Sequence, residues 1–180
     1  MSTEKLYYTE PETSHCDARV VSVCDDGDST IIELDRNLFY PEGGGQPCDL
    51  GSIAGIPVQS VTESDDGRIL HRLSAQAMAD VCTLRAGDSV QLELNQMRRM
   101  DHSQQHSAQH LLSATILRLC GAPTRSFHLG ERYSVIDVDT PSLPMADALT
   151  VEDEVLRVIR ENWPMVTHLC PPEDVTSFPL

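Results

Sequence analysis

The sequence has few aromatic residues and no long apolar run. Phe, Trp and Tyr make up 4% of the 180 residues, so any core must consist mainly of Val, Leu, Ile and Ala. No window of about 18 residues is apolar throughout, as a transmembrane helix would require. The first 17 residues are polar and lack the apolar centre of a secretion signal. We therefore expect a cytoplasmic protein with no membrane span.

The sequence also has no CxxC pair among its six cysteines. Without a secretion signal, cysteines at such wide spacing are expected to be reduced thiols and not a disulfide framework. A chain of this length buries about two-thirds of the surface that its unfolded form exposes, so it can fold without disulfides. The composition thus excludes a disulfide-stabilised miniprotein.

Basic residues are scarce, with 13 Lys and Arg against 28 Asp and Glu and a net charge of −15. Such a charge argues against a polyanionic partner. The segment 98–132 is an exception, because it holds five arginines, two acids and four of the seven histidines. Charge alone leaves two interpretations of this segment open, a solvated helix face or a surface for nucleic acid.

The first half of the sequence predicts a small β-barrel. Short β-branched or alternating runs are bounded by turn sequences such as Asp-Asp-Gly, which is typical of small all-β domains. The predicted strands are 18–23, 30–34, 58–62, 69–73 and 89–94. We assign residues 1–95 to this domain.

The second half, residues 96–180, predicts a mixed domain, so the whole chain is expected to be α+β. Apolar residues at helical spacing predict a helix over 97–119, with Gly121 as its C-cap. A second helix is expected over 150–162, with Thr150 and Asp153 as a capping pair. Strands are expected at 133–138 and 165–169.

Three histidines, His102, His106 and His110, follow one another at intervals of four residues on the long predicted helix. Side chains at i and i+4 lie on one helix face, and two imidazoles so placed can bind one zinc ion. Spacing does not decide between the pairs 102/106 and 106/110. Neither pair has the glutamate of an HExxH metalloprotease motif. The alternative is that all three are ordinary surface or core histidines.

A run of three glycines, residues 43–45, precedes Gln46 in the segment FYPEGGGQP. Glycines permit positive φ and leave the main chain open to the polar atoms of a ligand. The segment lacks the GxxxxGK[ST] pattern of a phosphate-binding P-loop. The alternative to a binding loop is a flexible turn.

Three segments together resemble a known family. FYPEGGGQPCDLG is followed about sixty residues later by RRMDHSQQHSAQHLLSA and then by SFHLGERYSVIDVD. In this order they resemble the editing domain of alanyl-tRNA synthetase and, more closely, the free-standing alanyl-tRNA editing proteins of the AlaX type. The likeness extends from about residue 18 to residue 180. Threonyl-tRNA synthetase has a related HxxxH domain, but the GGGQP loop favours the alanyl branch.

The resemblance implies a β-barrel followed by an α/β editing core of the type found as an additional domain in threonyl- and alanyl-tRNA synthetases. It implies zinc-dependent hydrolysis of the ester that joins serine, or glycine, to tRNA(Ala). The implied zinc ligands are His106 and His110, with Gly44, Gly45 and Gln46 lining the aminoacyl pocket. His102 and His128 are expected near the site, without an assigned role. The expected tRNA contacts are Arg98, Arg99, Arg125 and Arg132.

One feature departs from the family pattern. The family completes its zinc site with a CxxxH motif, and no CxxxH occurs in this sequence. The chain ends at Leu180, so we expect the C-terminal part of the editing core to be missing, or His168 and Cys170 to act as substitutes. Two non-catalytic alternatives are a tRNA-binding or interaction module with an incomplete metal site, and a structural zinc protein. Zinc could activate water or hold the substrate amino group.

Overall fold

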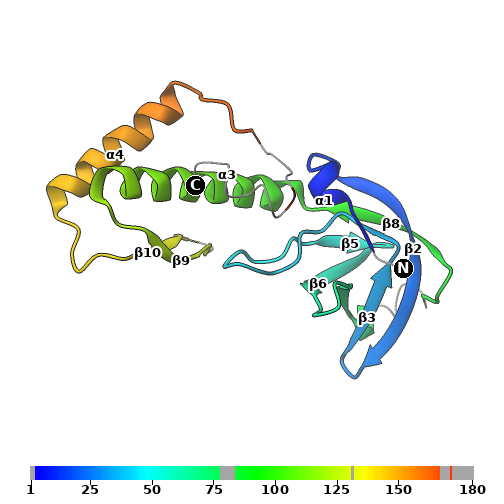
Figure 1. Cartoon of the computed structure of the whole chain (residues 1–180). Coiled ribbons are helices and arrows are strands. Elements are labelled where there is room, and N and C mark those ends of the chain that lie inside the picture. The colour runs from blue at the N-terminus through cyan, green and yellow to red at the C-terminus, as the bar shows by residue number, and fades with distance from the viewer. Residues whose placement is uncertain (1–2, 78–83, 131, 167–170, 172–180) are drawn as a thin grey trace.

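The computed structural model describes residues 3–77, 84–130, 132–166 and 171. Figure 1 shows a β-barrel joined by the long helix α3 to a smaller layer made of a hairpin and the helix α4. The predicted α+β class and small barrel are confirmed. Among the described residues, no helix is long and apolar enough to cross a membrane.

The barrel closes through six described strands in the order β2-β3-β7-β6-β5-β8. Their bounds are β2 His15–Asp26, β3 Ser29–Leu34, β5 Gly51–Ile53, β6 Ile56–Glu63, β7 Ile69–Ser74 and β8 Ser89–Leu94. The long strand β2 closes the barrel because its first part pairs with β8 and its second part pairs with β3. A register shift between Val20 and Ser22 lies near this change of partner. Such a bulge bends a strand, as closure requires.

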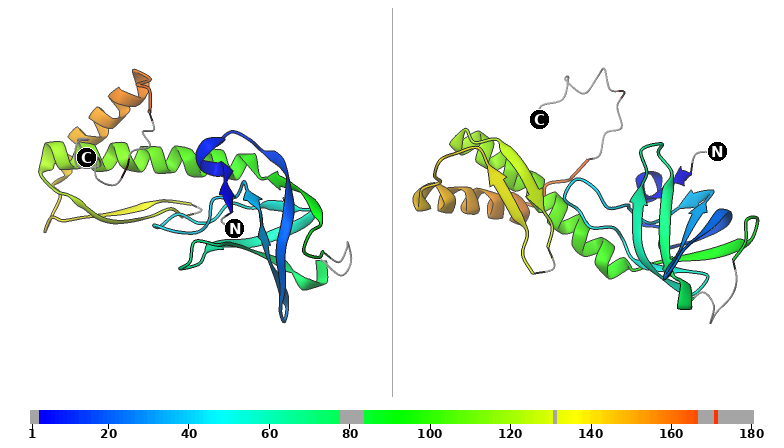
Figure 2. Two further views of the ribbon diagram at one scale, coloured as in Figure 1. Left: turned by 45° about the vertical axis from the view of Figure 1, so that its right-hand side comes forward. Right: turned by 90° about the horizontal axis from the view of Figure 1, so that it is seen from below.

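Strict alternation of buried and exposed residues builds the barrel interior. Along β8 the residues Val90, Leu92 and Leu94 point inward, and the intervening ones are exposed. Aliphatic side chains dominate the core, as the scarcity of aromatic residues requires, and Phe39 is the one fully buried aromatic among the described residues. Figure 2 shows the strands curving around this interior.

Two short elements precede the barrel, β1 (Glu4–Lys5) and α1 (Leu6–Thr9). β1 pairs in parallel with β4 (Arg36–Asn37), which follows β3. From β4 the chain passes through residues 38–50, which include the glycine run, before it enters β5. Sequence patterns did not indicate β1, α1, β4 or β5, because each spans only two to four residues.

The helix α3 (Gln96–Cys120) is one residue longer at each end than predicted. Its N-cap is Asn95, whose side chain accepts a hydrogen bond from the Arg98 amide. Gly121 ends the helix in the left-handed conformation, with φ of 66°, so the predicted C-cap is confirmed. The helix leaves the barrel directly after β8 and extends well beyond it (Figure 1).

The smaller layer packs on the far part of α3. It consists of the antiparallel pair β9 (Thr124–His128) and β10 (Val135–Val138) and the helix α4 (Met145–Arg160). A small core joins α3 to α4 through Ile116, Ala122 and Val151. Figure 1 shows the hairpin on one side of α3 and α4 on the other.

Three predictions for this layer need correction. The second helix begins at Met145, not at Thr150, and Thr150 is an interior residue whose hydroxyl donates to the Ala146 carbonyl. The strand predicted over 133–138 begins at Val135, and β9 was not predicted. A strand was also predicted over 165–169. Residues 165 and 166 belong to no strand, and residues 167–169 lie outside the described residues.

Candidate active site

The glycine run forms a tight turn that leaves the barrel and approaches α3. Gly43 and Gln46 are joined by two backbone hydrogen bonds, of 3.1 and 3.0 Å. Gly44 and Gly45 have positive φ, 58° and 83°, which only glycine adopts readily. The turn therefore requires glycine at these two positions, and it is ordered by its own hydrogen bonds.

The turn lies directly against β9. The Leu129 amide donates to the Gly45 carbonyl at 2.9 Å. A Cβ atom on Gly45 would lie 2.1 Å from the Phe127 carbonyl oxygen, well inside van der Waals contact. The same addition to Gly44 would meet nothing within 4 Å. Gly45 thus permits close packing on β9, while the main chain at Gly44 stays open.

Gln46 connects the turn to the first of the two expected zinc ligands. Its Oε1 lies 2.6 Å from Nδ1 of His106. An amide oxygen only accepts, so Nδ1 of His106 carries the proton and donates it. In the neutral ring this leaves the lone pair on Nε2. A hydrogen bond to the second ring nitrogen commonly fixes the tautomer and orientation of a metal-binding histidine.

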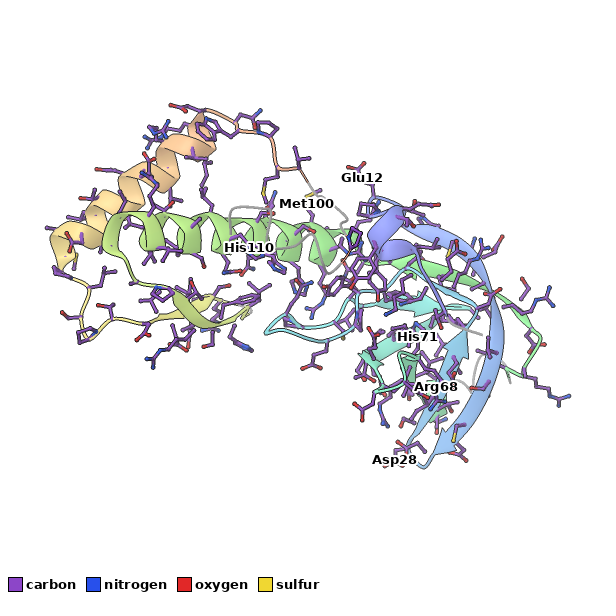
Figure 3. The ribbon with its side chains drawn as sticks, in the orientation of Figure 1. Glu12, Asp28, Arg68, His71, Met100 and His110 are labelled. Carbon is purple, nitrogen blue, oxygen red and sulfur yellow. The ribbon has the colours of Figure 1, made fainter. Side chains whose placement is uncertain are left out.

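His106 stands between two other rings. The His110 ring stacks on it with centroids 4.8 Å apart and planes inclined by 19°, and the Phe127 ring lies 5.3 Å away. Burial, with a smaller contribution from His110, lowers the pKa of His106. A lower pKa keeps the ring neutral near pH 7, as metal binding requires. Figure 3 marks His110 on the side of α3 toward the turn and the hairpin.

The structure brings together His106 and His110, and this pair fits half of a zinc site. Zinc is usually bound by four ligands, or by three and a water molecule. No group of three or more His, Cys, Asp or Glu side chains that could hold a metal occurs among the described residues. The suggested substitutes His168 and Cys170 lie outside these residues.

His102 does not join the stacked pair. It lies one helical turn earlier and, with His128, lines a separate cavity of about 440 Å³. The His102 side chain is 6% exposed, and its Nδ1 has no hydrogen-bond partner in the described part of the chain. Burial, together with the charge of Arg98, lowers the pKa of His102.

The four arginines expected to contact tRNA differ in their surroundings. Arg98 lines the same cavity and donates through Nε to the Cys48 carbonyl. Arg125 is exposed and pairs with Asp139, and Arg132 is also exposed. Arg99 has a different environment, because all three of its guanidinium nitrogens are bonded inside the protein. Whether any of the four contacts tRNA stays a prediction.

The Arg99 contacts join α3 to the barrel domain. Its guanidinium donates to Asp49, Leu38 and Pro11, and the Asp49 carboxylate is almost wholly buried. Asp49 also accepts from the Tyr40 amide. Neither Asp49 nor Phe127 was singled out in the sequence, although both lie inside segments that carry the family resemblance. Only the three-dimensional contacts distinguish them from their neighbours.

Comparison with known proteins gives the family. The chain is 39% identical over 137 residues to the alanyl-tRNA editing protein Aarsd1 of Mus musculus. The alignment covers 74% of this chain and 31% of that protein. It is 34% identical over 141 residues to the alanyl-tRNA editing protein AlaX-L of Pyrococcus horikoshii, covering 76% and 33%. The chain belongs to the AlaX-type alanyl-tRNA editing family. No family model matches it.

The family likeness extends to a synthetase. An alanine–tRNA ligase of Methanothrix thermoacetophila is 30% identical over 183 aligned residues, covering 96% of this chain and 18% of the ligase. The chain spans about a third of the length of the editing proteins that it matches. These editing proteins are therefore about three times as long as the region that aligns with this chain.

Proposed function

We propose that this chain takes part in editing mischarged tRNA(Ala), by hydrolysing the ester between the tRNA 3′ end and serine or glycine. The names of the relatives support alanyl-tRNA editing as the activity. The observation that carries the proposal is the hydrogen bond from His106 Nδ1 to Gln46 Oε1. It joins two of the three segments that carry the family resemblance, although the bonded residues lie 60 positions apart.

His106 and His110 are the residues that would hold zinc in this proposal. When bound, zinc would supply a water molecule with a pKa near 7 or a position for the substrate amino group. Gln46 would keep His106 in the tautomer whose Nε2 is free. The remaining ligands would lie outside the described residues, since no third His, Cys, Asp or Glu side chain within them completes a metal site with this pair.

The turn at Gly44 supplies a place for the aminoacyl group. In the described structure the Gly44 N–H and carbonyl make no backbone hydrogen bond, and the space beside its Cα is open. Polar main-chain groups of this kind can bind the serine hydroxyl. A site that hydrogen-bonds a hydroxyl discriminates against the analogue that lacks it, because the polar groups of the site are then left unpaired. This would favour serine over alanine.

The test is the hydrolysis of Ser-tRNA(Ala) and Ala-tRNA(Ala) by this chain, with zinc content measured by elemental analysis. We expect faster loss of Ser-tRNA(Ala), and loss of both zinc and activity in His106→Ala. His15→Ala is the matched control, because His15 is an exposed histidine of the barrel. Unchanged turnover in His106→Ala would contradict the proposal.

Two other results would favour the alternatives. Tight binding of tRNA without any shortening of the ester lifetime would indicate a non-catalytic tRNA-binding module. Stoichiometric zinc with no effect of tRNA would indicate a structural zinc protein.

A further inference from the structure

The cavity beside His102 is lined by three side chains that can donate hydrogen bonds, Arg98, His102 and His128, together with one acid and three residues without polar side chains. Arg98, Asp101 and His102 line it from α3, and His128 lines it from the end of β9. Its volume, about 440 Å³, is in the range of small-ligand sites. Asp101 is the only acid in this lining, and its Oδ2 already accepts from Gln105. The cavity therefore offers a cation and two imidazoles to a ligand, beside one carboxylate that is held by Gln105.

Two of these side chains have nitrogen atoms without a partner inside the described structure. His102 is more than nine-tenths buried, yet its Nδ1 has no hydrogen-bond partner there. A buried polar atom without a partner is destabilising, so such atoms are uncommon unless a ligand or water meets them. Arg98 uses Nε on the Cys48 carbonyl, and its two terminal nitrogens bond to no described residue. Arg98 is thus free to donate, whereas Nδ1 of His102 is fully buried and would reach a ligand only after a turn of the ring.

Three residues that line the cavity are close in the chain to residues of the His106 site. Pro47, in its lining, follows Gln46, which bonds His106. His128 follows Phe127, whose ring lies against His106. His102 precedes His106 by four residues, which is about 6 Å along a helix. A ligand group in the cavity would lie about one sugar-phosphate unit from the histidine pair.

We propose that this cavity binds the phosphodiester of the last nucleotide of the RNA, with Arg98 and His102 donating to its oxygens. The inference rests on the proposed function, because it places the aminoacylated end at His106. In that nucleotide, O5′, C5′, C4′, C3′ and O3′ separate the phosphorus from the ester. A phosphate oxygen only accepts hydrogen bonds, so it matches the donors of this lining. Arg98 and His102 are binding residues in this assignment.

The test compares two RNA hairpins that end in CCA, with the last phosphodiester either normal or replaced by a neutral methylphosphonate. Binding of each to the full chain is measured by fluorescence anisotropy. We expect the unmodified chain to bind the normal hairpin about tenfold more tightly, as loss of one charge-assisted hydrogen bond predicts. Arg98→Gln and His102→Leu should each reduce the tenfold difference between the hairpins, and His102→Gln should recover part of it.

Arg118→Gln is the matched control, because Arg118 is an exposed arginine of the same helix that pairs with Glu154. It should keep the tenfold difference. Salt dependence gives a second readout that does not involve catalysis. Arg98→Gln should reduce the slope of log K against log salt by about 0.7, the value for one contact to a single strand. If His102→Leu fails to fold, Arg98→Gln alone decides the outcome.

The outcomes separate this site from the proposed function. If the unmodified chain hydrolyses Ser-tRNA(Ala) while Arg98→Gln still discriminates between the hairpins tenfold, the phosphate assignment is overturned and the editing function stands. If the unmodified chain neither binds the hairpins nor hydrolyses the ester, the proposed function fails and this site fails with it.

Discussion

Oε1 of Gln46 accepts a hydrogen bond of 2.6 Å from Nδ1 of His106, and this bond joins the glycine turn of the barrel to the third turn of α3. Gln46 lies between β4 and β5, and His106 lies on α3, 60 positions further along the chain. The contact makes the orientation of the His106 ring depend on the barrel. It also makes Gln46 testable separately from any metal ligand.

Gln46→Ala should lower zinc affinity and deacylation by about 10- to 100-fold, the usual effect of removing a residue that orients a metal-binding histidine. Zinc affinity is measured by competition with a chelator, and deacylation with Ser-tRNA(Ala). Gln91→Ala, at an exposed position of β8, should leave both unchanged. Equal values for the unmodified chain and Gln46→Ala would show that His106 needs no partner.

Gly45→Ala should displace the turn from β9, because its Cβ would lie 2.1 Å from the Phe127 oxygen. Gly44→Ala is the control with the same backbone cost, about 1–2 kcal/mol for an L-residue at positive φ, but with open space around the added carbon. Hydrogen exchange of the Leu129 amide, which donates to Gly45, should accelerate only in Gly45→Ala. Acceleration of the same size in both variants would rule out the close contact as the cause.

Arg99→Met should lower the free energy of unfolding by about 3–5 kcal/mol, because it leaves the buried Asp49 carboxylate without its counter-ion. The two side chains are 14% and 1% exposed. Arg125→Met removes a pair whose side chains are 67% and 52% exposed, and should change stability by less than about 1 kcal/mol. Urea unfolding measures both. Similar losses in the two variants would contradict the structural role of Arg99.

Stability should fall in mild acid because of His71, whose side chain is fully buried in the barrel. Burial lowers its pKa to about 4, although the hydrogen bond to the Ile32 carbonyl works in the opposite direction. Since the folded-state pKa lies below the unfolded value of about 6.5, the contribution is complete above pH 6.5 and is lost as the pH falls toward 4.

Between pH 7 and pH 5 this loss amounts to about 2 kcal/mol. Urea unfolding at the two pH values gives the drop in the free energy of unfolding for each protein. The drop should be about 2 kcal/mol larger in the unmodified chain than in His71→Gln. The comparison is needed because carboxylates also begin to titrate in this range. An equal loss in both proteins would exclude His71 as the source.

Periodic patterns in the sequence predicted the larger elements correctly. The alternation in SVQLEL indicates β8, and the apolar spacing between Asn95 and Gly121 defines α3 to within one residue at each end. Thr150 and Asp153 suggested a helix start because they resemble a capping pair. The preceding residues favour helix as well, and the Thr150 hydroxyl is bonded within the helix, so α4 begins one and a half turns earlier.

The residues of the candidate site were chosen from the sequence, which could not give their contacts. The spacing of the histidines left two pairs open, and the family resemblance chose His106 and His110, whose rings the structure stacks together. The resemblance could not tell Arg99 from Arg98, which are neighbours with the same chemistry. All three guanidinium nitrogens of Arg99 donate hydrogen bonds to residues of the N-terminal half, whereas Arg98 lines a cavity. That difference depends on residues some 50 positions away, which no local pattern encodes.

Two of the contacts that hold α3 to the N-terminal part of the chain are made by Arg99 and His106, which are seven residues apart and therefore lie close to the same angular position on the helix. The contacts of Arg99 thus fix the rotation of α3 about its axis, and the position of His106 depends on that rotation. Inserting a single residue between them would rotate His106 by about 100° relative to Gln46 while every local helical preference stayed satisfied. The number of residues in this interval, and not only their identity, is therefore part of what specifies the site.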